Sequence, residues 1–168
     1  MNDQIIAAAA ARELEAESAS TTKCLERIPF ELFGYKPHPR SMELGYLVTL
    51  ISEIPYWITY IITKGDIDFA TFEHYQPKNT QDVVDRFHRN VAEAKEALLS
   101  VTDGELDKEF SLKSKGELLM KSTKREQVEQ SINHMVHHRG QLTVYMRLNE
   151  IAVPSIYGPS ADDKNYQK

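Results

Sequence analysis

Four long segments of this chain carry apolar side chains at the spacing of an α-helix, which constrains the possible folds more than any other feature. We expect helices over approximately 3–27, 41–64, 80–100 and 123–150, followed by a tail over 151–168. Strand-type alternation is scarce elsewhere. The sequence therefore predicts an all-α fold, in which residues 1–168 form a single four-helix-bundle domain.

The expected helix starts carry residues that cap helices. Asp3, Ser41 and Asn79 (or Thr80) are suitable N-caps, and Thr123–Glu126 has the Thr-x-x-Glu pattern of a capping box. The segment 102–122 contains turn-forming glycines and fits either a short hairpin before the fourth helix or a loop packed over the bundle. The later connections are long, so the topology need not be simple up-down-up-down.

Charge and composition limit the kinds of partner and the cellular location that we expect for this protein. The net charge of −5 gives no reason to expect nucleic acid, and no apolar run suggests a membrane span or a signal peptide. A single cysteine, Cys24, excludes an intramolecular disulfide. We therefore expect a cytoplasmic protein that binds neither nucleic acid nor membrane.

Two histidines in the fourth expected helix are candidate metal ligands. His134 and His138 are four residues apart, so both imidazoles lie on one side of the helix and can reach one metal ion. The alternative is a hydrogen-bonded pair that faces a pocket without metal. Gln141 and Tyr145 share this stripe, whereas Arg139 falls in the apolar arc and should need a buried carboxylate or carbonyl partner.

A ligand pocket is expected between the second and fourth helices. Its candidate lining residues come from one edge of the second helix and from the histidine stripe: Tyr46, Leu50, Trp57, Gln141 and Tyr145.

The stretch NHMVHHRGQLTVYMRLNEIAVPSIYGPS, Asn133–Ser160, resembles the DinB-like (DinB/YfiT) superfamily. The upstream ERIP, YKPHPRS and EIPYW stretches are also similar. The resemblance implies a bacterial four-helix bundle of up-down-down-up order that forms a homodimer. It also implies a divalent metal on three ligands and, in characterised members, thiol transfer or isomerisation with mycothiol or bacillithiol.

One of the three metal ligands that the resemblance implies is missing here. Two of them correspond to His134 and His138, but the third, a histidine three residues before Glu-Ile-Pro, is replaced by Leu50. Glu53, one turn further along, could supply a carboxylate instead, and His88 is a weaker candidate. We therefore expect a degenerate metal site.

Three functions stay open. The favoured one is a protein that binds a small molecule, or binds metal weakly, at the degenerate site. The second is a metal-dependent thiol S-transferase-like or hydrolase-like enzyme. It would use His134, His138 and a substitute ligand, with zinc, nickel or another divalent ion and a low-molecular-weight thiol. The third is a non-catalytic structural dimer. The sequence identifies no catalytic residue.

Overall fold

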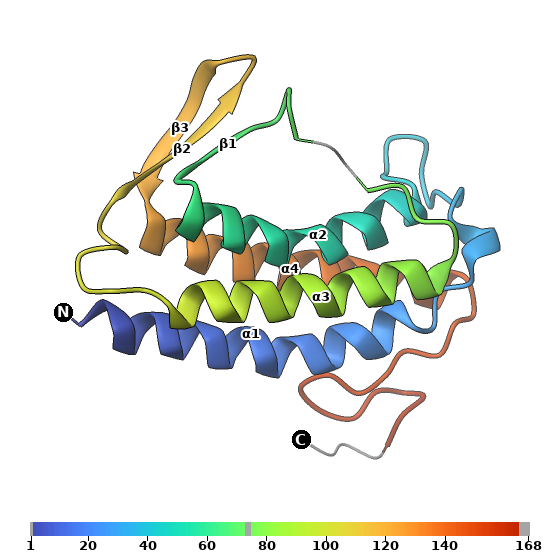
Figure 1. The fold of residues 1–168 in the computed structure, drawn as a ribbon. Helices are drawn as coiled ribbons and strands as arrows, with labels where there is room; N and C mark the ends of the chain where they lie inside the picture. Colours follow the sequence, from blue (N-terminus) through green and yellow to red (C-terminus); the bar gives the residue numbers. More distant parts are fainter. Residues whose placement is uncertain (1, 73–74, 165–168) are drawn as a thin grey trace.

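The computed structural model describes residues 2–72 and 75–164, in which four helices pack side by side (Figure 1). The first and last helices run in one direction and the middle two run in the other. The helices are α1 (Asp3–Leu25), α2 (Leu44–Thr63), α3 (Thr80–Leu99) and α4 (Lys124–Leu148), and a 3-10 turn, η1 (Phe30–Leu32), precedes α2.

The expected all-α class is wrong, because three strands form a mixed sheet beside the helices. The strands are β1 (Asp66–Asp68), β2 (Glu109–Ser114) and β3 (Glu117–Thr123), in the order β1-β2-β3. β2 and β3 form an antiparallel hairpin, which confirms one of the two structures expected for 102–122. β1 pairs with β2 in parallel. The hairpin projects from the end of the bundle where α4 begins (Figure 1).

Contacts distant in sequence hold β1 in the sheet. Asp66 forms an ion pair with Lys113 at 2.7 Å, and the Asp68 carboxylate accepts backbone N–H groups from Lys115 and Gly116. Lys115 and Gly116 have φ of 52° and 79°, the left-handed conformation that a two-residue hairpin turn requires. A three-residue strand gives no periodic signal in sequence, so β1 could not be expected.

The observed caps partly match the expected ones. Asn79 caps α3, and the Thr123–Glu126 capping box begins α4, as expected. The other two expectations are wrong: Asn2 rather than Asp3 caps α1, and α2 begins after Glu43 without a side-chain cap. Asp3 is instead fully buried, where it pairs with Arg125 at 3.1 Å.

Helix α2 lies at the centre of the core. By length and composition alone it could cross a membrane, contrary to our expectation from the sequence, but 67% of its most apolar window is buried inside the fold. Pro55 lies within it, and Cys24 of α1 is also buried. Burial raises the pKa of the Cys24 thiol to about 11, so it is protonated at neutral pH and not nucleophilic.

Candidate functional site

The histidine pair on α4 forms a direct hydrogen bond. Nε2 of His138 lies 2.7 Å from Nε2 of His134, and Nδ1 of His138 lies 2.7 Å from Oε1 of Gln141. The Gln141 oxygen can only accept, so Nδ1 of His138 carries the proton and its Nε2 accepts. His134 therefore donates from Nε2 and has an acceptor nitrogen at Nδ1, for which the described residues provide no partner.

Both imidazoles favour the neutral form. Burial lowers the pKa of His134 below its ordinary value of 6.5, and the neighbouring His138 and His137 lower it further. Burial also lowers the pKa of His138, against the hydrogen bond to Gln141, which raises it. A neutral pair is the state in which one ring donates to the other.

The donor set does not fit a complete three-ligand metal site. Leu50, which the family resemblance places at the position of the third ligand, has no lone pair. In the part of the chain that the structure describes, no three His, Cys, Asp or Glu side chains are grouped so that they could hold a metal ion. The Nε2–Nε2 distance of 2.7 Å is also shorter than the roughly 3.3 Å between two imidazole nitrogens on one tetrahedral zinc.

The two candidate substitute ligands lie in other surroundings. Glu53 is buried, and its Oε1 accepts the backbone N–H of Tyr75 at 2.6 Å. It lines a cavity of about 370 Å³ with Tyr46 and Leu50, and neither histidine of the pair borders that cavity. Nε2 of His88 lies 3.0 Å from Oγ1 of Thr22, between α3 and α1.

A second cavity lies between α2, α4 and the sheet, and His134 forms part of its wall. This sheet cavity has a volume of about 260 Å³, and the centroids of the Trp57 and His134 rings lie 5.6 Å apart. Its walls are mostly apolar, with a polar strip from α4. They comprise Trp57, Ile61, Ile67, Phe69, Phe110, Leu112, Met120, Gln127, Gln130, Ser131 and His134.

Trp57, in the wall of the sheet cavity, carries a buried donor without an acceptor. Nε1 of Trp57 is buried and has no hydrogen-bond partner within 2–72 and 75–164. An unpaired buried N–H costs roughly 1–3 kcal/mol. Two residues in the wall of a mostly apolar cavity therefore carry one unpartnered donor, on Trp57, and one acceptor nitrogen, on His134.

The expected pocket residues do not line one cavity. Tyr46 and Leu50 border the cavity of Glu53, and Trp57 borders the sheet cavity. Gln141 orients His138, and the buried Tyr145 donates its hydroxyl to the backbone oxygen of Met42 at 3.1 Å.

Sequence reasoning missed the contribution of the sheet to the site. Phe110 and Leu112 alternate along β2, and Met120 lies opposite Leu112 on β3. This alternation was the available signal, but it is too short to show which helices the hairpin covers.

Comparison with known proteins identifies the family of this chain. A model of the DinB family matches residues 1–168. The uncharacterized protein YrdA of Bacillus subtilis is 33% identical over 158 residues, which are 89% of this chain and 86% of YrdA. YjoA of the same organism is 28% identical over 128 residues, or 76% of this chain and 80% of YjoA.

Two crystal structures share the fold. The DinB-like protein YjoA of Bacillus subtilis has a TM-score of 0.67 at 20% identity, covering 93% of this chain and 99% of that one. A DinB-like protein of Bacillus cereus has a TM-score of 0.62 at 25% identity, covering 85% and 92%. The full-length family match and the relative at 33% identity show that this chain belongs to the DinB family.

Proposed function

We propose that this protein binds a small, mostly apolar molecule with one hydroxyl group in the sheet cavity, and that it does so without a metal. The observation that carries the proposal is the pairing of Trp57 and His134 at the cavity wall. One offers a buried N–H without a partner and the other an acceptor nitrogen.

The size of the cavity limits the ligand. Its volume of about 260 Å³ lies just below the roughly 300–1,000 Å³ of most ligand pockets. The walls from Ile61, Phe110 and Met120 favour apolar contact. A molecule built on one ring fits these limits.

The polar pair selects the functional group. A hydroxyl can accept a hydrogen bond from Nε1 of Trp57 and donate one to Nδ1 of His134. Gln141 fixes the tautomer of His138, and through it that of His134, so the acceptor is oriented before the ligand arrives. Phenol carries this chemistry on a single ring.

A titration with phenol and toluene tests the proposal. Trp57 is the only tryptophan, so its fluorescence reports on the sheet cavity directly. We expect saturable phenol binding that is tighter than toluene binding. His134→Leu should weaken phenol binding about tenfold while changing toluene binding little.

His137→Leu is the matched control, because His137 is an exposed histidine of the same helix that does not line the cavity. It should leave both affinities unchanged. The proposal is wrong if phenol leaves Trp57 emission unchanged, or if the two leucine variants weaken phenol binding equally.

A chelator tests the independence from metal. EDTA should change neither the Tm nor the phenol affinity of protein purified without an affinity tag. A lower Tm after chelation would mean that the native state holds a metal, and would contradict the proposal.

The metal-dependent thiol transferase-like enzyme is the second candidate, and the convergent Nε2 atoms of His134 and His138 favour it. It requires a third ligand in place of Leu50. Metal-dependent thiol transfer that is lost in His138→Ala would support it.

The homodimer and the cytoplasmic location stay predictions. Light scattering on the purified chain measures the first, and cell fractionation the second.

A further inference from the structure

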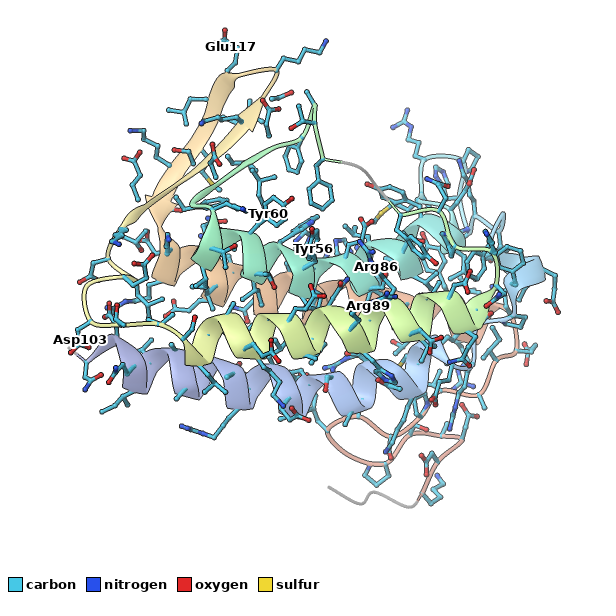
Figure 2. The ribbon with its side chains drawn as sticks, viewed as in Figure 1. Tyr56, Tyr60, Arg86, Arg89, Asp103 and Glu117 are labelled. Atoms are coloured by element: carbon cyan, nitrogen blue, oxygen red, sulfur yellow. The ribbon has the colours of Figure 1, made fainter. Side chains whose placement is uncertain are left out.

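A third cavity lies on the side of α2 that faces α3, and its lining differs from that of the sheet cavity. Figure 2 shows Tyr56, Tyr60 and Arg86 side by side along these two helices. This Arg86 cavity has a volume of about 550 Å³. Its lining combines aromatic and charged groups: Tyr56, Tyr60, Lys64, Asp66, Ile67, Asp68, Thr71, Phe72 and Arg86.

The Arg86 guanidinium contacts two tyrosine rings. Its Cζ lies 5.5 Å from the ring centroid of Tyr56 and 5.1 Å from that of Tyr75. Its Nε is buried and has no acceptor, and across 2–72 and 75–164 no carboxylate lies within ion-pair distance of Arg86. The rings hold the guanidinium in place by cation–π contact, and no carboxylate of the described residues neutralises its positive charge.

The two carboxylates in the cavity wall already have partners. Asp66 pairs with Lys113, and Asp68 accepts the backbone N–H groups of Ala70, Lys115 and Gly116 at 2.8–3.0 Å. The backbone hydrogen bonds lower the pKa of Asp68, so it stays ionised and engaged. Both aspartates are therefore held by other groups, and neither forms an ion pair with Arg86.

Other groups in the cavity wall can help Arg86 to bind an anion. Lys64 is exposed at the end of α2 and adds a second cation. A side-chain hydrogen bond with Tyr60 raises the pKa of Tyr56, so the Tyr56 phenol is neutral at neutral pH. Since one hydroxyl hydrogen joins the two tyrosines, the other remains to donate to a ligand. These groups suit an oxyanion, which binds planar guanidinium edges especially well.

We propose that the Arg86 cavity binds the oxyanion group, carboxylate or phosphate, of a small molecule. Arg86 supplies the main charge, Lys64 a second charge, and the hydrogen-bonded tyrosine pair one further hydroxyl donor. The site is independent of the proposed phenol site: only Ile67 lines both cavities. Phe72 contacts Trp57 as well as Tyr56 and Tyr60, so it lies between them.

Calorimetric titration with benzoate, phenyl phosphate and inorganic phosphate tests the proposal. We expect saturable binding of at least one probe, weakened about tenfold or more in Arg86→Gln. The affinity of Arg86→Lys should lie between those of the unmodified protein and Arg86→Gln, because lysine keeps the positive charge but lacks the planar guanidinium. Added salt should weaken binding, because the site is solvent-accessible.

Arg89→Gln is the matched control. Arg89 lies on the same helix as Arg86, is exposed, and does not line the cavity (Figure 2). It should bind every probe as the unmodified protein does, and thermal melting should show that all variants are folded. His134→Leu should leave these affinities unchanged, which separates this proposal from the phenol site.

The probes also identify the source of the oxyanion. Inorganic phosphate binding as tightly as phenyl phosphate indicates a free phosphate, whereas a preference for benzoate indicates an organic carboxylate. The proposal is overturned if no probe binds saturably below about 10 mM, or if Arg89→Gln weakens binding as much as Arg86→Gln.

Discussion

Nη2 of Arg139 lies 2.6 Å from Oε2 of Glu17, which joins α4 to α1 inside the bundle. Arg139 is only 1% exposed. The Tyr157 hydroxyl completes a triangle, since it accepts from Arg139 at 2.7 Å and donates to Glu17 at 2.8 Å. Of the two kinds of partner that the sequence predicted for Arg139, a carboxylate or a carbonyl, the carboxylate of Glu17 is therefore present. The same contacts hold the tail against α1.

Arg139→Ala should strongly destabilise the fold. It leaves Glu17 partly buried without its cation, and breaking a buried pair in this way costs roughly 3–5 kcal/mol of unfolding free energy. Arg147→Ala is the control, because the ion pair of Arg147 with Asp162 is largely exposed to solvent and should contribute far less to stability. Urea unfolding measures both, and equal losses would contradict a structural role for Arg139.

The lowered pKa values of the histidine pair predict a pH-dependent stability. The unfolded chain binds protons at the ordinary value of 6.5, whereas folded His134 and His138 bind them only at lower pH. The unfolding free energy should therefore be constant above about pH 7.5 and fall as the pH drops below 6.5. It should level off once the folded histidines are protonated too.

His134→Asn should make this fall clearly less steep, because it removes one member of the pair. His137→Asn should have a smaller effect, because it removes only a neighbouring charge that adds to the lowered pKa values of the pair. Urea unfolding between about pH 7.5 and pH 5.5 avoids most of the carboxylate titrations. A slope that is the same in both variants would show that the pair does not cause it.

The parts of the fold with a strong local signal could be predicted from sequence. The apolar periodicity located all four helices, and the Thr123–Glu126 pattern marked the start of α4. Asp3 shows the limit of this reasoning: Asn2 caps the helix, and Asp3 pairs with Arg125, 122 residues away. Such a partner leaves no trace in a single sequence.

The candidate site could be predicted only in part, for the same reason. The i, i+4 spacing brought His134 and His138 together, because one helix fixes their geometry. The cavity beside them depends on where the hairpin lies over α2 and α4, and β1 is only three residues long. No local pattern could therefore show that Phe110 and Met120 would face His134.

The capping box at the start of α4 should contribute measurably to stability. The Thr123 hydroxyl accepts the backbone N–H of Glu126 at 3.2 Å, and the Glu126 carboxylate accepts that of Thr123 at 2.8 Å. Thr123→Ala should lower the unfolding free energy by about 1 kcal/mol. Thr143→Ala, in the middle of the same helix, should be neutral or slightly stabilising because alanine favours helix. An unchanged stability in Thr123→Ala would contradict a stabilising role for the cap.

Leu50→His should raise the zinc affinity of the chain. Two imidazoles, from His134 and His138, already converge within 2.7 Å, and a structural or catalytic zinc site needs at least one protein ligand more. If position 50 corresponds to that ligand, the variant should bind zinc more than about tenfold more tightly, as measured by competition with a chelating dye. The double variant Leu50→His/His138→Ala should lose the gain, because it again offers only two imidazoles. If the Leu50→His variant folds but binds zinc no better than the natural chain, residue 50 does not face the histidine pair. That result would contradict the degenerate-site hypothesis.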